Sequence, residues 1–469
     1  MKEAVKRIPL YTKSNKILIK LHTYLLFFMS LTFLNIQNAS GAIDPFLLTK
    51  NDNFRKSTAG FTNNASNFVG DLIDFKITCP TKSFQIKAIR IGFYDGKEGK
   101  VIQKSKSISC KDQMDKTPSK WSVTASINTT NFPHGMYLFQ IEDDQRFSSF
   151  VPVILREKNS TAKAIFSIPI MTMQAYNTWS GADTYGAAGN FDKRLRIVDF
   201  RKPYDKNFGT GKYLKYVHPL VVYIEKLNLD VAYVADTDLH FEKDLLANRT
   251  VLISAGHDEY WTLQERNSVL SARKSGMNTL FFGANAGYWN TRLVKSSLDE
   301  SITMEIYKSA KEDPNKFNPT VKFREINKPE SELTGLEYKC FPAKGELEIR
   351  TPDSSIFRGI KNLDNLDLGK IVGVEVDTFK DDNNFRGEII NLAESRVRCG
   401  DKWYFPRYGT MNMILGFGIN GEGGLFSSGT MGWVVQGLSS RENSDIGMFT
   451  RTVTKNILES AIEGPLGKD

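Results

Sequence analysis

The chain has 469 residues, a length that predicts two or three domains with ample buried core. Its 41% hydrophobic and 25% charged residues are those of an ordinary globular protein. The formal net charge is +9, but no dense run of Arg and Lys follows the first 42 residues, so the charge does not indicate a nucleic-acid partner.

The first 42 residues have the layout of a secretory signal peptide. Six basic residues precede an apolar run at residues 25–34, and Ser40-Gly41-Ala42 is a small-x-small site, so we expect cleavage after Ala42. The run is too short to span a bilayer comfortably, which disfavours an uncleaved anchor. Cleavage removes the six basic residues and Glu3 and lowers the charge from +9 to +4. We therefore expect a secreted or periplasmic protein with no membrane attachment after cleavage.

Residues 43–157 predict an antiparallel β-sandwich of roughly Ig-like size. Short alternating or β-branched runs are separated by turn residues, and no convincing amphipathic helix interrupts them. The runs are DLIDFKITCP, FQIKAIRIGFYDG, WSVTASINTT, GMYLFQIEDD and SSFVPVILRE. The short polar segment KNSTAK, residues 158–163, is interpreted as a linker.

Four cysteines follow the leader, namely Cys79, Cys110, Cys340 and Cys399. An even number in an exported chain indicates disulfides, and three pairings are open. We favour Cys79 with Cys110 and Cys340 with Cys399, since each pair closes a loop within one domain. Zinc is disfavoured because no two cysteines lie at short ligand spacing.

Residues 158–469 alternate strands with helices and predict a doubly wound α/β domain. A buried strand at 164–170 is followed by a helix at 216–227 and by a strand at 230–235 that ends in DTDLH. A strand–helix–strand unit comes next, and its helix at 262–275 begins at a Thr able to cap and ends before Gly276. The pattern then weakens into loops and strands (TVKFREI, GELEIR, KIVGVEVDTF), before an apolar strand with a Gly-rich turn at 421–437 and a closing helix at 446–461.

Polar side chains gather where the strands of this domain end. VLISAGHDEYW places His257 and Glu259 after one strand, and the next strand breaks into GANAGYW, which contains Asn285. The loops after the first strand add QAYNTW and the segment RKPY at residues 201–204. Open α/β sheets bind ligands at the carboxyl ends of their strands. Any one of these residues could cap a helix or pack, but four loops that meet at one sheet edge favour a site.

Taken in order, these motifs resemble the C-terminal domain of the large (beta) subunit of N,N-dimethylformamidase. The matching motifs are QAYNTWSG, RKPY, SAGHDEYW, GANAGYW, Tyr307-Lys308, Asp313-Pro314, GVEVD at residues 373–377 and FSSGTMGW, which together cover about residues 160–460. IRIGFYDG and FPHGMYLFQ are similar to the β domain that precedes it in that family. The resemblance implies an α/β domain similar in fold to class I glutamine amidotransferases.

The resemblance also implies a mononuclear iron, expected as Fe3+, held by two tyrosines and one glutamate. Carried across by motif, the metal ligands are Glu259, Tyr176 and Tyr204, and Tyr185 competes for either tyrosine position. The implied catalytic residues are His257 beside the metal, Asn285 as a substrate-binding or polarising group, Glu375 as a general base, and Lys308.

This set of residues is chemically coherent for amide hydrolysis. Phenolates and a carboxylate are hard oxygen donors that favour a hard, highly charged cation. Such an ion polarises a carbonyl or lowers the pKa of bound water. A Ser or Cys nucleophile is disfavoured, because no G-x-S-x-G elbow occurs and His257-Asp258-Glu259 stands where amidotransferases would have a catalytic Cys. We predict an exported metal-dependent hydrolase of carbon–nitrogen amide bonds with a small-molecule amide as substrate.

Two departures from the family bear on this prediction. Formamidase large subunits act with a small partner subunit and usually lack an export signal, so the substrate here need not be the family's. A non-catalytic periplasmic module that binds a glycan or polymer is the alternative, with stacking residues Trp179, Trp261, Trp289 and Trp433. The oxygen ligands together with Glu375 favour the enzyme. A homo-oligomer is compatible with the sequence.

Overall fold

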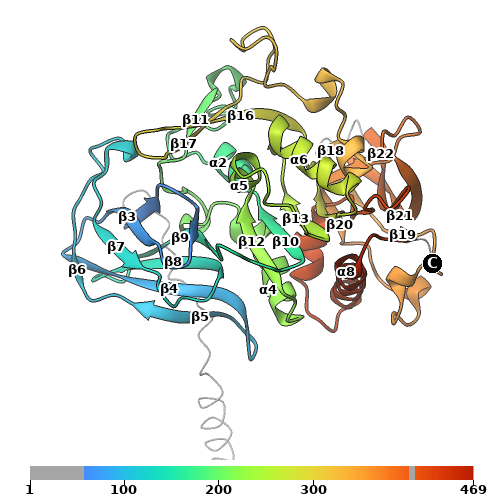
Figure 1. Cartoon of the computed structure of the whole chain (residues 1–469), viewed down its shortest axis with the longest axis horizontal. Helices are drawn as coiled ribbons and strands as arrows, with labels where there is room; N and C mark the ends of the chain where they lie inside the picture. Colours follow the sequence, from blue (N-terminus) through green and yellow to red (C-terminus); the bar gives the residue numbers. More distant parts are fainter. Residues whose placement is uncertain (1–57, 401–406, 468–469) are drawn as a thin grey trace, which may run out of the picture. The chain divides into compact units, whose positions relative to one another are not determined.

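The computed structural model describes residues 58–400 and 407–467, so the predicted signal peptide lies outside the described residues. All of them belong to one compact unit, Thr49–Asp469. This unit is a mixed α/β fold with several β-sheets (Figure 1). Over the described ranges, no helix is long and apolar enough to cross a membrane.

Two sheets of the amino-terminal part pack face to face as a sandwich. The strands are β1 (Ala59–Thr62), β3 (Leu72–Thr78) and β7 (Ala125–Asn128) in one sheet, and β2 (Ser66–Phe68), β4 (Ser83–Tyr94), β5 (Lys97–Lys104), β6 (Ile108–Ser109), β8 (Gly135–Asp143) and β9 (Ser148–Arg156) in the other. Alternate residues of each strand face the shared core, which contains Phe75, Ile86 and Phe139. One edge departs from the predicted antiparallel arrangement, because β2 pairs with β9 in parallel.

Both favoured disulfides are present in the structure. Cys79 is bonded to Cys110 and Cys340 to Cys399, with Cα–Cα distances of 5.2 and 5.8 Å. The first bond joins the residue after β3 to the residue after β6, and the second joins β18 (Glu337–Gly345) to the end of β21 (Gly387–Cys399). The predicted pairing is therefore confirmed.

The double substitution Cys340→Ala/Cys399→Ala is expected to lower the free energy of unfolding by about 2–4 kcal/mol. The bond spans 59 residues, so its loss returns much of the loop's conformational entropy to the unfolded chain. Urea unfolding of the oxidised variant and wild type measures the difference. A midpoint that does not move would contradict a stabilising role for this bond.

The second part contains a ten-stranded sheet in the order β12-β10-β13-β15-β23-β22-β21-β18-β20, with β19 beside β21. The strands not yet given are β10 (Ala164–Ile168), β12 (Val231–Ala235), β13 (Val251–His257), β15 (Asn278–Ala284), β19 (Glu348–Ile349), β20 (Val372–Thr378), β22 (Arg407–Gly418) and β23 (Leu425–Ser427). The first five strands of the order are parallel, as predicted. The chain after residue 296, where the sequence pattern is weak, adds β22, β21, β18 and β20 to this sheet in antiparallel pairing.

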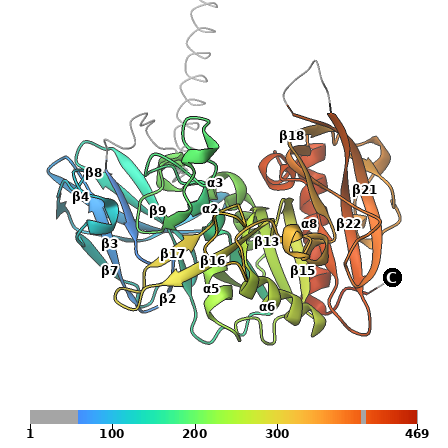
Figure 2. The same cartoon turned by 90° about the horizontal axis from the view of Figure 1, so that it is seen from above.

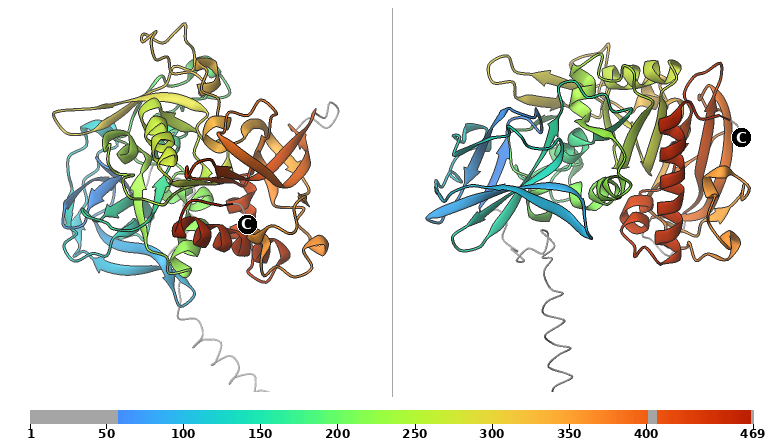
Figure 3. Two further views of the ribbon diagram at one scale, coloured as in Figure 1. Left: turned by 45° about the vertical axis from the view of Figure 1, so that its right-hand side comes forward. Right: turned by 60° about the horizontal axis from the view of Figure 1, so that its bottom comes forward.

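Helices cover both faces of the parallel strands (Figures 1 and 3). They are α2 (Ile170–Ala175), α3 (Tyr213–Tyr216), α4 (His218–Lys226), α5 (Asp236–Phe241), α6 (Leu263–Lys274), α7 (Ser331–Thr334) and α8 (Asp445–Glu463), with a short π-helix η8 (Trp433–Leu438). On one face, Leu239 of α5 and Val269 of α6 share a core with Ile165 of β10. On the other, Trp433 contacts the rings of Phe426 and Phe449.

A smaller sheet continues from the ends of the central strands (Figure 2). Its order is β11-β17-β16-β14, with bounds β11 (Ile197–Asp199), β14 (Tyr260–Thr262), β16 (Trp289–Lys295) and β17 (Ile302–Glu305). β14 follows β13 and β16 follows β15, and the two new strands again pair in parallel. The turns between these four strands therefore lie side by side, at the predicted edge of the large sheet.

Local sequence accounts for one element well and fails at another. α6 begins with the expected capping box, in which the Thr262 hydroxyl accepts the N–H of Glu265 and the Glu265 carboxylate accepts the N–H of Thr262. The strand predicted at TVKFREI is wrong, because Phe323–Ile326 is a 3-10 helix, η5. The N–H of Phe323 donates to the carbonyl of Tyr288, so it bonds to a loop and not to a neighbouring strand.

Candidate active site

Glu259 is held just after the end of β13 by a backbone conformation that requires glycine and by helix α2. Gly256 has a φ of +62°, and a Cβ there would overlap the carbonyl of Tyr216, so only glycine fits. Beyond it, the hydroxyl of Thr172 accepts the N–H groups of Glu259 and Tyr260 at 2.9 and 3.1 Å. The Glu259 side chain is thereby fixed where the parallel strands end.

Three hydrogen-bond donors converge on the Glu259 carboxylate. The Tyr176 hydroxyl donates to Oε2 at 2.6 Å and the Tyr185 hydroxyl to Oε1 at 2.5 Å. The indole N–H of Trp289 lies 3.0 Å from Oε1 and also 3.0 Å from the Tyr185 oxygen. The rings of Tyr176 and Tyr185 are stacked, with their centres 5.5 Å apart. Because both hydroxyls donate to Glu259, two phenol oxygens and one carboxylate lie together.

A lysine lies over the ring of each of these two tyrosines. Lys212 Nζ is 3.4 Å from the centre of the Tyr176 ring, and Lys308 Nζ is 3.1 Å from that of Tyr185. Lys308 also donates to the Tyr260 hydroxyl at 2.6 Å. A cation above an aromatic face is attracted to its electrons, and it stabilises negative charge that develops on the phenol oxygen.

His257 lies between Lys212 and the acidic groups. Its Nδ1 is 2.9 Å from Lys212 Nζ, and its Nε2 is 3.1 Å from Glu259 Oε2 and 3.9 Å from Glu375 Oε1. Because an ammonium can only donate, this arrangement assigns the proton of the neutral imidazole to Nε2. Within the described part of the chain, that atom makes no hydrogen bond of good geometry, and the Glu259 carboxylate is its close neighbour.

Glu375 and Asn285 form a second pair beside this group. The Asn285 amide donates from Nδ2 to Glu375 Oε2 at 2.7 Å, and its backbone N–H bonds to both oxygens of Asp377 at 2.9 and 3.0 Å. Asn285, directly after β15, has a left-handed φ of +62°, and Val374, the neighbour of Glu375 within β20, has a φ of +64° where β20 and β18 pair irregularly. The buried Oδ1 of Asn285 makes no hydrogen bond to any described residue.

Burial and charge separate the protonation states of the acids. Burial favours neutral Glu259, but contact with His257, the Lys308 charge and the Tyr176 hydroxyl outweigh it and lower its pKa to about 2. Burial, and then the charge of Glu259, raise the pKa of Glu375 to about 8. Burial and the Lys212 charge lower the pKa of His257 to about 4. One carboxylate is thus ionised, beside a second that can hold a proton at neutral pH.

Burial also sets the pKa of the phenols and lysines. The pKa of Tyr176 and of Tyr185 is raised far above the usual range, first by burial and then by the negative charge of Glu259. Burial lowers the pKa of Lys212 to about 8 and of Lys308 to about 7. A strong local positive charge is therefore required to ionise the two phenols at neutral pH.

The structure brings together most of the predicted site residues but not Tyr204. Tyr204 is buried, and the polar groups that influence it are Asp236 and Gln174 rather than Glu259. Its ring packs beside Gly211, which has a φ of +61° and no room for a Cβ. Tyr185, the other tyrosine that the sequence offers as a metal ligand, lies next to Glu259 instead. Of the candidate ligands named from the sequence, Tyr176, Tyr185 and Glu259 are thus the three that meet, and Tyr204 lies apart from them.

Sequence reasoning missed several members of this group. Lys212 and Thr172 touch the central residues, although neither was assigned a role from the sequence. Trp289, in the GANAGYW motif, was considered only as a stacking residue of the alternative function, whereas its indole N–H contacts Glu259. Lys212 and Thr172 lie in segments without a recognisable motif, so no local pattern marks them.

The stacking residues of the alternative function are inside the protein. Trp179, Trp261, Trp289 and Trp433 are 8%, 0%, 7% and 0% exposed. An indole stacks on a sugar only through an open face, so these four side chains offer no glycan platform.

The donor set fits a hard cation better than a soft one. In the described ranges, no group of three or more His, Cys, Asp or Glu side chains is placed to hold a metal ion. The Tyr176, Tyr185 and Glu259 set is of another kind, with one ionised carboxylate and two phenols that would become anionic if a cation bound. The unpaired His257 Nε2 and Asn285 Oδ1 leave polar positions open next to it.

Comparison with known proteins gives one informative match. No curated protein matches the chain. A solved structure of a Paenibacillus sp. cycloisomaltooligosaccharide glucanotransferase complexed with cycloisomaltoheptaose is 7% identical, covers 54% of this chain and 34% of that chain, and has a TM-score of 0.17, which supports no inference. The family model described as N,N-dimethylformamidase beta subunit-like, C-terminal, matches residues 85–445. This span holds every residue of the candidate site, and the chain belongs to the N,N-dimethylformamidase beta subunit-like family.

Proposed function

We propose that this protein is an exported, metal-dependent hydrolase of carbon–nitrogen amide bonds. The observation that carries the proposal is the convergence of Tyr176 and Tyr185 on the two oxygens of buried Glu259. Family membership suggests a hydrolase, and the two disulfides support a chain that folds in an oxidising compartment. The substrate class is a small-molecule amide.

Family membership also supports finer assignments of the fold. We infer an Ig-like character for the sandwich and kinship with class I glutamine amidotransferases for the α/β part, whose parallel strands carry helices on both faces. The proposed domain boundary at residues 157–158 falls between β9 and β10.

In this proposal, Tyr176, Tyr185 and Glu259 hold a single iron ion, expected as Fe3+. When bound, such an ion would polarise the amide carbonyl, lower the pKa of water, and supply the positive charge that the two buried phenols need in order to ionise. Lys212 and Lys308 add positive charge above the two rings and offset part of the negative charge of the three anionic ligands.

The remaining residues bind substrate and move protons. Glu375, buried and held by Asn285 Nδ2, accepts a proton from the attacking water, since its raised pKa makes it a stronger base than an ordinary glutamate. It then delivers that proton to the departing amine nitrogen. Asn285 Oδ1, which makes no hydrogen bond to a described residue, and His257 Nε2–H beside Glu259 are the polar atoms that can fix the substrate. His257 Nε2–H is a neutral donor suited to a developing negative oxygen.

Substituting the tyrosines separately identifies the ligands. Tyr185→Phe and Tyr176→Phe are expected to bleach or shift the visible tyrosinate-to-iron absorption band, because each removes a phenol oxygen and keeps the ring's packing. Tyr204→Phe is the matched control, since it deletes a buried phenol away from Glu259. Iron content, absorption and amide hydrolysis of the purified variants provide the measurement. If Tyr204→Phe removes the band and Tyr185→Phe does not, the proposed ligand set is wrong.

A further inference from the structure

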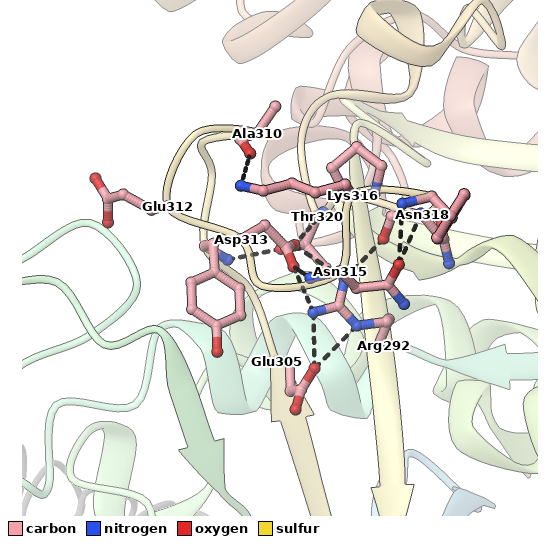
Figure 4. A network of polar contacts seen from close by, with 12 residues as sticks. Arg292, Glu305, Ala310, Glu312, Asp313, Asn315, Lys316, Asn318 and Thr320 are labelled. Atoms are coloured by element: carbon pink, nitrogen blue, oxygen red, sulfur yellow. Dashed lines mark hydrogen bonds and ion pairs between the residues drawn. The ribbon is translucent and has the colours of Figure 1, made fainter.

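A buried carboxylate organises the segment that leaves β17 and carries Lys308 (Figure 4). Asp313 is 0% exposed. Arg292 of β16 donates two hydrogen bonds to the Asp313 carboxylate, from Nη1 to Oδ2 at 2.9 Å and from Nη2 to Oδ1 at 2.8 Å. The same guanidinium donates from Nε to Glu305 of β17 at 2.9 Å. The segment is therefore bound to both strands of the hairpin from which it emerges.

Asp313 also satisfies backbone groups within its own segment. The N–H and the hydroxyl of Thr320 each donate to Oδ2 at 2.6 Å, and the N–H of Asn315 donates to Oδ1 at 2.9 Å. Burial opposes ionisation of this carboxyl, but the Arg292 and Thr320 bonds prevail and lower its pKa to about 2. A charged acceptor with this many donors fixes the segment far more firmly than neutral bonds would.

Thr320 connects this hub to Lys308. Its hydroxyl accepts the N–H of Tyr307, and its carbonyl accepts the N–H of Lys308, both at 2.8 Å. Lys308 has a φ of +56°, a left-handed conformation that a lysine keeps only where its surroundings impose it. These bonds aim the side chain at the site, where its amino group meets the Tyr260 hydroxyl and the Tyr185 ring.

We propose that Asp313 is a positioning residue that, through Thr320, sets the Lys308 amino group over Tyr185. The inference rests on the proposed function, in which Tyr185 is a metal ligand. A cation 3.1 Å from the ring centre stabilises the phenolate only at that place, so loosening the segment weakens the effect although no ligand is lost. The sequence placed Asp313-Pro314 among the family motifs without a role, and this contact network supplies one.

The test compares Asp313→Asn with Glu312→Gln. Asn keeps the size of the side chain but loses its charge and an acceptor, whereas Glu312 is a neighbouring acid whose side chain is 41% exposed and bonds Arg194 and Arg196 instead. Brief acylation of the metal-free protein with an N-hydroxysuccinimide acetate, read at Lys308 by peptide mass spectrometry, reports directly on the position of that amine. Iron content, the absorption band, kcat and KM are measured on the iron-loaded proteins.

In Asp313→Asn, we expect Lys308 to be acylated about tenfold faster, the absorption band to shift, and kcat to fall about 10–100-fold at similar KM and similar iron content. Glu312→Gln should match wild type in all of these.

Equal acylation of Lys308 in folded Asp313→Asn and wild type overturns the inference. If wild type binds no iron, the proposed function fails, while the acylation result still decides the role of Asp313. Should Asp313→Asn not fold, Thr320→Val replaces it with the same expected labelling, and unchanged labelling overturns the inference.

Discussion

Glu259→Ala is expected to lose both the bound metal and all amide hydrolysis while the protein stays folded. The substitution removes the one acceptor that Tyr176 and Tyr185 share, and leaves two phenols to hold a trivalent ion. Without that ion nothing ionises the phenols, because burial alone raises the pKa of both. The loss should therefore exceed the roughly 10–100-fold that removal of an outer partner of a metal ligand typically costs.

Metal analysis and activity assays of the same preparation make this prediction decisive. Circular dichroism confirms the fold, and Tyr204→Phe serves as the variant that alters a buried polar group away from Glu259. Full metal occupancy in Glu259→Ala would remove the central ligand from the proposal. A wild type that holds no metal and hydrolyses no amide, yet binds glycans, would return the protein to the non-catalytic alternative despite its buried tryptophans.

The position of Glu259 could be predicted because it depends on the regular part of the fold. β13, α6 and β15 follow from an apolar run, a capped helix and a second apolar run, and parallel pairing then places their ends together. His257 and Asn285 fall at these ends for the same reason. Their approach to Glu259 and Glu375 is thus a consequence of strand register.

The choice between Tyr185 and Tyr204 could not be made this way. Both lie in the irregular chain between α2 and α3, where no period fixes which side chain turns inward. Tyr185 reaches Glu259 because a small turn, closed by the Asp183–Gly186 bridge, presents it there. That turn depends on contacts made only in the folded protein.

The burial of charged loop residues could not be predicted from local sequence either. Lys212 and Asp313 appear as ordinary surface residues in a sequence, since charged side chains in loops are usually solvated. Their partners are distant along the chain: His257 for Lys212, and Arg292 for Asp313. Only the tertiary fold shows that each is enclosed and paired.

Glu375→Gln is expected to keep the metal and lose turnover, by about 10²–10⁴-fold in kcat. Glutamine has nearly the same shape and can still accept the Asn285 bond on one oxygen, so the site should remain assembled. It cannot take a proton from water, and that step is the role assigned to Glu375. Since Glu375 makes no direct bond to Tyr176, Tyr185 or Glu259 in the contacts of the described residues, the absorption band should persist.

The same role of Glu375 predicts how the rate changes with pH. A general base works only when deprotonated, so the rate rises with pH through its pKa. Burial and the charge of Glu259 raise the pKa of Glu375 to about 8, so the acid limb of kcat/KM should lie above the range of an ordinary glutamate. In Glu375→Gln that limb should vanish from the residual activity. An unchanged limb, or wild-type turnover in the glutamine variant, would assign the proton transfer to another group, with His257 the nearest candidate at 3.9 Å.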